Sequence, residues 1–218
     1  MNKQLLIGLG LILAIFLLTA MSCKKLTTET NLDDSLDPVE EVFRINGANN
    51  ATIIVNRAQD SYFSIDFSEI NENNVIGNGE GEGWCIDWQK PIDSNGGVYT
   101  NIQLYSTYNV SKWKPINYLF NMMDQLKQDD PEITYLEVQV AIWVMRGNPA
   151  FDLETMEVTD LPSRMHSNGE PTFSREKVNY IVSLVESGYR DFTATEGSRF
   201  VVIAETPADV QTVITVVE

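Results

Sequence analysis

The fold is decided by residues 134–149, TYLEVQVAIWVMRGNP, a stretch that predicts one helix with both of its ends marked. Thr134 and Glu137 have the spacing of a capping box, in which each side chain satisfies a backbone N–H at the start of a helix. Residues 147–149, Gly-Asn-Pro, are a stop signal. Between these ends the residues are apolar almost all round, which is typical of a helix buried within a protein.

Two further helices are predicted on either side of this one. Residues 116–126 carry apolar side chains at helical spacing, and Asp129-Asp130-Pro131 ends the pattern. A later helix begins after Ser174, which is a suitable N-cap, and stops at Gly188. Each helix has an apolar stripe for a core: Ile116, Leu119, Phe120, Met123 and Leu126 in the first, and Val178, Ile181, Val182 and Val185 in the second.

The segments outside the helices have the alternating pattern of β-strands. We expect strands within residues 42–70, 98–108, 199–205 and 210–217, a glycine-rich loop at 71–83, and a long polar excursion at 148–173. No internal repeat is present in the sequence. The order of strands, helices and strands predicts an α+β fold, namely an antiparallel β-sandwich or barrel with an inserted helical subdomain of about three helices.

The charge and the residue counts exclude several classes of protein. The 218 residues include 15 Lys and Arg against 31 Asp and Glu, for a net charge of −16. A nucleic-acid surface needs clustered basic residues, so nucleic-acid binding is not expected. Two cysteines and one histidine are too few for a thiolate or histidine metal site, and we expect neither a metal nor another cofactor.

The first residues have the pattern of an export signal. Lys3 precedes an apolar run over residues 5–18, and Ala20-Met21-Ser22-Cys23 resembles the lipobox of a bacterial lipoprotein. We expect a signal peptide at 1–22, an acidic linker at 23–41 that begins with lipid-bearing Cys23, and one domain at 42–218. The expected location is the bacterial envelope, at the outer membrane surface, in a Bacteroidota-like lipoprotein. A plain signal peptide or a single transmembrane anchor is the alternative.

Two residues of the expected domain need an explanation. If Cys23 carries lipid, Cys85 has no partner left for an intramolecular disulfide. Gln139 is the one polar side chain within the apolar stretch of the buried helix, and an unpaired buried amide group costs about 1–3 kcal/mol. An inert buried thiol and a hydrogen-bonded glutamine would account for both. An internal thioester between the two side chains would also do so, since it consumes the thiol and the amide NH2.

Here the sequence resembles the bacterial thioester domains of surface adhesins. Trp84-Cys85-Ile86-Asp87, with Pro91 and Tyr99, resembles their cysteine motif, and residues 138–143, VQVAIW, resemble their glutamine motif. The resemblance spans residues 75–218, including the later helix and Gln211 in the closing strand pair. Val138 stands where the family usually has threonine, and the single domain on a short tether differs from the long proteins that carry such domains.

The resemblance implies a function and its residues. Cys85 and Gln139 would form the thioester, and an amine such as a lysine on a partner would attack it to give covalent adhesion. Trp84, Trp88 and Trp143 are expected as walls that exclude water, with Asp87 close to them. The partner would be an amine-bearing protein surface, on a host or a neighbouring cell, and the protein would not be an enzyme.

Two other functions remain open from the sequence. One is a non-covalent binding or assembly lipoprotein on the same fold, without a reactive thioester. The other is a cysteine hydrolase, which would depend on His166 as its base because that is the only histidine in the chain.

Overall fold

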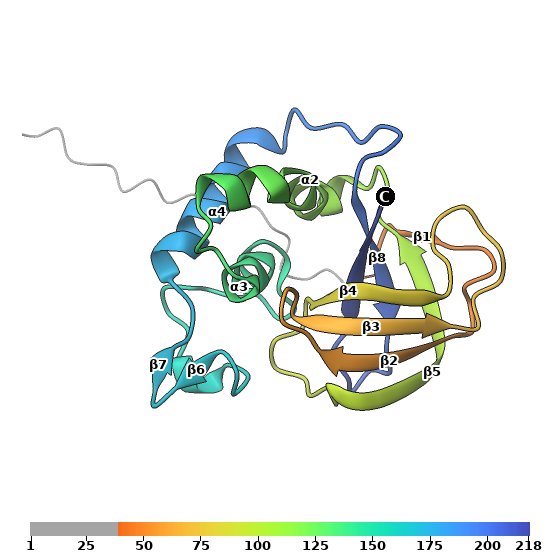
Figure 1. The fold of residues 1–218 in the computed structure, drawn as a ribbon, viewed down its shortest axis with the longest axis horizontal. Helices are drawn as coiled ribbons and strands as arrows, with labels where there is room; N and C mark the ends of the chain where they lie inside the picture. Colours follow the sequence, from red (N-terminus) through yellow and green to blue (C-terminus); the bar gives the residue numbers. More distant parts are fainter. Residues whose placement is uncertain (1–38) are drawn as a thin grey trace, which may run out of the picture. The chain divides into compact units, whose positions relative to one another are not determined.

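The computed structural model describes residues 39–218, in which one antiparallel sheet is interrupted by three α-helices (Figure 1). Its strands are β1 (Phe43–Arg44), β2 (Ala51–Arg57), β3 (Phe63–Ser68), β4 (Gly79–Cys85), β5 (Asn95–Ser106), β8 (Phe200–Glu205) and β9 (Val213–Val217). The helices are α2 (Lys114–Asp129), α3 (Tyr135–Arg146) and α4 (Arg175–Gly188), with short 3₁₀ turns at Ser111–Trp113 and Val158–Asp160. A two-stranded hairpin, β6 (His166–Ser167) and β7 (Glu170–Pro171), precedes α4.

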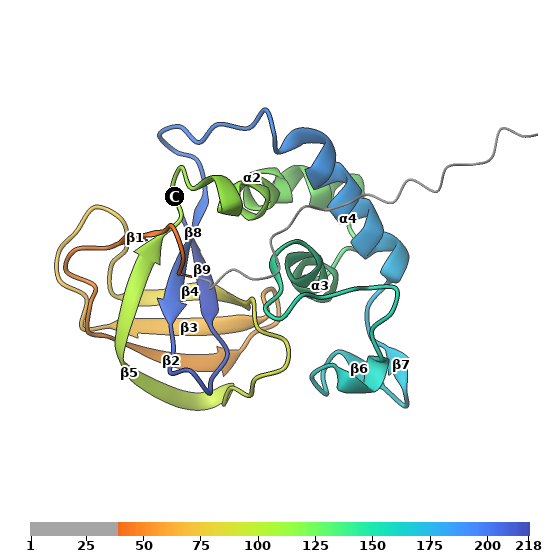
Figure 2. The same ribbon diagram turned by 180° about the vertical axis from the view of Figure 1, so that it is seen from behind.

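The sheet closes on itself. Its order is β1-β5-β2-β3-β4-β9-β8, and β8 also pairs with β5, so that six strands form a closed antiparallel barrel with β1 as an additional strand. The three helices lie in the chain between β5 and β8, and they gather on one side of the strands (Figure 2). The predicted α+β barrel with an inserted helical subdomain is therefore confirmed.

Alternating residues of the strands fill the barrel. Ile53 and Val55 of β2 pair across the sheet with Phe67 and Ile65 of β3, and all four side chains are buried. Residues directly opposite each other in an antiparallel pair share a face, so these pairs form one apolar layer. The residues between them, Ile54 in β2 and Asp66 in β3, lie on the other face and are more exposed.

One predicted loop contains a strand instead. The glycines and asparagines of residues 71–83 predict a loop, but β4 begins at Gly79 and pairs with β3 as far as Gly83. A Cβ atom at Gly83 would lie 2.6 Å from the side chain of Ile65, and one at Gly81 would lie 2.7 Å from Thr215 Oγ1. The glycines thus allow close packing within the barrel rather than a turn.

The predicted polar excursion at 148–173 also proved wrong in part. It contributes five buried side chains to the core: Phe151, Leu153, Leu161, Met165 and Phe173. Their spacing in the sequence follows neither a helical nor a strand period, since most of the segment between α3 and α4 is irregular. The segment is an irregular surface loop that places these five side chains in the core and carries the β6–β7 hairpin.

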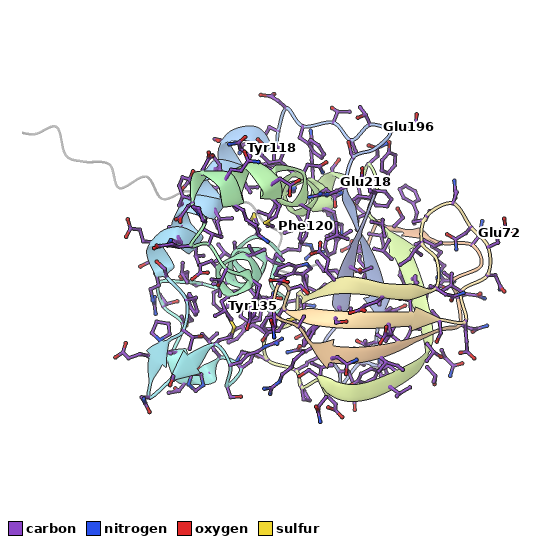
Figure 3. The ribbon with its side chains drawn as sticks, viewed as in Figure 1. Glu72, Tyr118, Phe120, Tyr135, Glu196 and Glu218 are labelled. Carbon is purple, nitrogen blue, oxygen red and sulfur yellow. The ribbon has the colours of Figure 1, made fainter. Side chains whose placement is uncertain are left out.

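The three predicted helices are all present. Thr134 and Glu137 form the capping box of α3, and Ser174 caps α4 by accepting a hydrogen bond from the Lys177 N–H. Helix α2 turns Phe120 toward the strands, where its ring lies 5.7 Å from that of Trp84 in β4 (Figure 3).

The predicted signal peptide, lipid-bearing Cys23 and most of the linker lie outside the described residues. Within residues 39–218, none of the helices combines the length and the apolar character that crossing a membrane would require.

Candidate functional site

Cys85 is the last residue of β4, at the end of the barrel that faces α3. It pairs with Val213 of β9, and the ladder continues for one more bond, from the Ile86 N–H to the Thr212 carbonyl at 3.3 Å. The Cys85 side chain is fully buried. The thiol is therefore fixed by a regular strand on one side and by the helical subdomain on the other.

Gln139 of α3 contacts Cys85 directly. The Cys85 N–H donates to Gln139 Oε1 at 3.0 Å, and Gln139 Nε2 donates to the Cys85 carbonyl oxygen at 2.7 Å. Both residues are fully buried, so neither bond competes with water. The structure thus brings together the two residues that the sequence resemblance paired, although 54 positions separate them.

The two hydrogen bonds fix the orientation of the Gln139 carboxamide. Because its oxygen and its nitrogen each bind the backbone of residue 85, the amide plane lies against the residue that carries the thiol. A backbone N–H at the carbonyl oxygen is also the donor that would stabilise negative charge if that carbonyl were attacked. The same bonds satisfy the buried polar groups, as a purely structural glutamine would require.

Helix α3 is held in place at both ends. At its start, Glu137 is buried and accepts hydrogen bonds from the Thr134 N–H at 2.9 Å, the Thr134 hydroxyl at 2.6 Å and the Ser174 N–H at 2.9 Å. Just past its end, the Asn148 N–H donates to the Ile86 carbonyl at 2.8 Å. These contacts join α3 to the cap of α4 and to the residue after Cys85, so Gln139 has little freedom to move away.

Aromatic rings surround part of this contact. The Phe151 ring lies between Trp88 and Trp143, with centroid distances of 5.3 and 5.7 Å, and Trp143 also lies 5.8 Å from Tyr62. Trp84 precedes Cys85 in β4, and successive side chains of a strand point to opposite faces. Accordingly, the ring contact of Trp84 is with Phe120 of α2, whereas Trp88 and Trp143 share one cluster.

Burial dominates the electrostatics of the thiol. Removal from water raises the pKa of Cys85 well above its ordinary value of 9.0. The Arg164 guanidinium and the Trp143 indole N–H oppose this shift in pKa, while the Asp87 carboxylate adds to it. The indole nitrogen has no regular hydrogen-bond partner, which leaves its N–H free to interact weakly with the sulfur.

Tyr62 and Arg164 are site residues that the sequence did not reveal. The Arg164 guanidinium carbon lies 3.2 Å from the centroid of the Tyr62 ring. Burial raises the pKa of the Tyr62 phenol well above 10.0, and the nearby Cys85 raises this pKa further, while Arg164 lowers it. Neither residue lies in a motif, and Arg164 belongs to the irregular segment between α3 and α4, so no local signal marked them.

Asp87 lies two residues beyond Cys85 and is 1% exposed. Its Oδ2 atom is 2.9 Å from the Lys90 ammonium, and no well-aligned hydrogen bond reaches either carboxylate oxygen. The ion pair explains how a carboxylate is retained at a buried position beside the thiol.

His166 lies in the β6–β7 hairpin and is half-buried. The charged and hydrogen-bonding groups that shift the pKa of Cys85 are Arg164, Trp143 and Asp87, and His166 is not among them. Among residues 39–218 there is also no cluster of three or more His, Cys, Asp or Glu side chains able to hold a metal ion.

Comparisons with known proteins give one match. No protein-family model matches the chain, and no curated protein matches its sequence. Among solved structures, the chain is similar to the N-terminal thioester domain of fibronectin-binding protein SfbI from Streptococcus pyogenes, with 13% sequence identity and a TM-score of 0.43. The similarity covers 78% of this chain and 93% of that domain.

Proposed function

We propose that Cys85 and Gln139 form an internal thioester, and that an amine on a partner protein attacks it to give covalent attachment. The observation that carries this proposal is the pair of hydrogen bonds between the Gln139 carboxamide and the Cys85 backbone. The sequence motifs around both residues support the same chemistry.

Formation of the thioester is an internal acyl transfer. Cys85 Sγ attacks Gln139 Cδ, the Sγ–Cδ bond forms, and the Cδ–Nε2 bond breaks. Nitrogen leaves as ammonia and takes the thiol proton with it, so atoms and charge balance. The Cys85 N–H, 3.0 Å from Oε1, stabilises the charge that develops on that oxygen. Val138 has no hydroxyl that could donate a hydrogen bond near Gln139, and the Cys85 N–H provides a donor that does not depend on residue 138.

In the capture of the partner, sulfur is the leaving group and nitrogen is the nucleophile. The amine nitrogen of a lysine attacks Cδ of residue 139, the new C–N bond forms, and the C–Sγ bond breaks. One proton of the amine passes to the sulfur, which leaves as a thiol. Because burial raises the pKa of Cys85, the released sulfur keeps this proton.

A thioester that waits for a partner must be kept from water. Cys85, Gln139 and Trp143 are fully buried, the rings of Phe151 and Tyr62 pack on Trp143, and Trp88 packs on Phe151. We assign these rings the task of excluding water, which slows hydrolysis of the bond.

The rest of the proposal concerns place and partner. Acylation at Cys23 would hold the domain at the bacterial envelope, at the outer membrane surface, and more than one fatty chain gives stable anchoring. The partner would be a protein surface with an accessible amine. Each molecule reacts once and is consumed, so the protein acts as an adhesin rather than as an enzyme.

The intact mass tests the proposal. Wild-type protein should be lighter by one ammonia than expected from comparison with Cys85→Ala, which carries the same processing. Methylamine should add its full mass to the wild type and leave Cys85→Ala and Gln139→Ala unchanged. An unmodified wild-type mass would leave Gln139 as a structural residue and favour a non-covalent binding lipoprotein. Turnover of acyl substrates that is lost in His166→Ala would favour a hydrolase.

The raised pKa of the buried Cys85 thiol makes the unfolding free energy depend on pH. In the form opened by methylamine, Cys85 is a thiol whose pKa is higher in the folded than in the unfolded protein. Its stabilising contribution is present below pH 9.0 and is lost as the pH rises. Between pH 9.0 and 10.0, the opened form should lose about 1 kcal/mol more unfolding free energy than Cys85→Ala.

Urea unfolding at several pH values measures this difference. Above pH 10.0 the raised pKa of Tyr62 lowers stability in both proteins, so the comparison belongs below that pH. If the unfolding free energies of the opened form and of Cys85→Ala change in parallel from pH 8.5 to 10.0, the thiol has the same pKa in the folded and unfolded protein. That result would contradict the prediction.

A further inference from the structure

A cavity of about 330 Å³ has Tyr62 in its wall, and the Tyr62 ring lies 5.8 Å from that of Trp143, four residues after Gln139 in α3. Its walls come from the end of β2, the start of β3, the segment that follows β4, the residues around Arg164 and the connection between β8 and β9. The lining residues that carry the argument are Arg57, Tyr62, Lys90, Asp160, Arg164 and Gln211. A volume of this size accepts one or two side chains of a ligand.

Residues in the cavity wall connect it with the residues that carry the proposed reacting atoms. Tyr62 and Arg164 line it, and both interact electrostatically with Cys85. Gln211 lies two residues before Val213, the residue paired with Cys85, and its N–H is bonded to the Pro91 carbonyl at 3.1 Å. A ligand in the cavity would therefore contact Tyr62 and Arg164, the wall residues that interact with Cys85.

Gln211 presents an unsatisfied acceptor to this cavity. The residue is 4% exposed, and its Oε1 atom is buried without a hydrogen-bond partner. A buried amide oxygen that lacks a partner is costly, so it is a good place for a ligand N–H to bind. An attacking amine carries such a donor.

Arg164 presents an unsatisfied donor in the same cavity. Its guanidinium stacks on the Tyr62 ring, and one of its terminal nitrogens is buried without a hydrogen-bond partner. A free guanidinium N–H is suited to a carboxylate oxygen, with which it forms a charge-assisted bond. The cavity thus offers an acceptor for a ligand N–H and a cationic donor for a ligand carboxylate.

The charges around the cavity differ from those of the whole chain. Three cationic side chains line it, Arg57, Lys90 and Arg164, against one carboxylate, Asp160. Lys90 is paired with Asp87, whereas among the described residues neither Arg57 nor Arg164 has a carboxylate within 4.0 Å. The whole chain has a net charge of −16, so the excess of cationic side chains in the cavity wall does not follow from the overall composition.

We propose that this cavity recognises an acidic protein segment, in which the attacking lysine has an Asp or Glu as a close neighbour. The carboxylate would bind Arg57 and Arg164, and an amine N–H would bind the Gln211 carboxamide. This inference rests on the proposed thioester. It restricts the amines that react with the thioester to lysines within acidic segments.

The same cations assist the reaction itself. A lysine ammonium has no lone pair, and a neighbouring guanidinium disfavours the charged form of an entering amine. The ammonium releases one proton to water, and the neutral amine attacks Cδ of residue 139. The C–Sγ bond breaks, and a second proton passes from nitrogen to sulfur. The carboxylate neighbour is needed to draw the segment in against this repulsion.

The experiment compares two peptides on the full chain. One is acetyl-Glu-Lys-Glu-amide and the other is the isosteric acetyl-Gln-Lys-Gln-amide, and intact mass follows the rate of adduct formation. We expect the acidic peptide to react about tenfold faster, as one charge-assisted contact provides. In Arg57→Gln the ratio of the two rates should fall toward one. Lys127→Gln, an exposed basic residue of α2, should keep the wild-type ratio.

The outcomes separate the two proposals. If methylamine fails to form an adduct with wild-type protein, the thioester itself is wrong. If methylamine reacts and both peptides react at equal rates, the thioester stands and the recognition of acidic segments is overturned. An unchanged rate ratio in Arg57→Gln would also overturn it, because a ratio within one variant is independent of how much of that variant is folded.

Discussion

Replacement of Gln139 by glutamate should abolish covalent capture completely and destabilise the fold at neutral pH. The side chain keeps its shape in Gln139→Glu, but a carboxylate has no ammonia to release. Its second oxygen would also face the Cys85 carbonyl oxygen, to which Nε2 of the unreacted glutamine donates at 2.7 Å. A charge buried against an acceptor should cost about 3 kcal/mol of unfolding free energy at pH 7.

The pH dependence of the stability of Gln139→Glu tests whether the buried charge causes the loss. Burial would raise the pKa of the introduced carboxyl above its unfolded value of about 4.3. Its protonated form restores a donor to the Cys85 carbonyl, so stability should recover below pH 4.3 and be lost as the pH rises. Chemical unfolding at pH 4 and pH 7 measures this. The control is Gln103→Glu, where the amide is only part-buried and donates to the carbonyls of Leu104 and Ala48. Equal losses in both variants at pH 7 would contradict the assignment.

Truncation of Trp143 should be the most destabilising change at the site. Trp143 is fully buried and packs on Tyr62 and Phe151, so Trp143→Ala leaves a cavity and should cost about 3–5 kcal/mol. The cavity would also admit water beside the thioester. We therefore expect Trp143→Ala, purified at low temperature, to contain mostly hydrolysed protein with a free thiol, as measured by intact mass and thiol titration.

Two variants separate packing from chemistry. Trp113 is equally buried but contacts Arg146, so Trp113→Ala should cost a similar amount of stability and retain the thioester. Trp143→Phe keeps a ring and removes the indole N–H that lowers the pKa of Cys85. It should slow formation of the thioester with a smaller loss of stability. If Trp113→Ala and Trp143→Ala lose the thioester to the same extent, the water-excluding role of Trp143 is wrong.

The helices could be predicted from the sequence because their signals are local. The capping box of Thr134 and Glu137 and the cap at Ser174 are contained within single turns, and the structure has them as expected. Strand β4 could not be predicted in full, since its glycines are explained by Ile65 and Thr215 on neighbouring strands. Local sequence carries no information about such contacts until the sheet is formed.

The same distinction applies to the site. The pairing of Cys85 with Gln139 came from a family resemblance, because nothing in their spacing requires the two residues to meet. The structure adds what no motif contained: the use of the Cys85 backbone to hold the carboxamide, and the approach of Tyr62 and Arg164. Arg164 reaches the site from an irregular segment, where neither period nor motif marks a residue as functional.

If the proposed thioester captures a partner, the way in which α3 is fixed has a mechanical consequence. A partner bound to residue 139 would pull on a helix, and not on the strand that ends at Cys85. The load would divide between the Glu137 hydrogen bonds to Thr134 and Ser174 at one end and the Asn148–Ile86 bond at the other. Drag from flowing liquid would therefore be shared by α4 and by the barrel, and would not unzip a single strand.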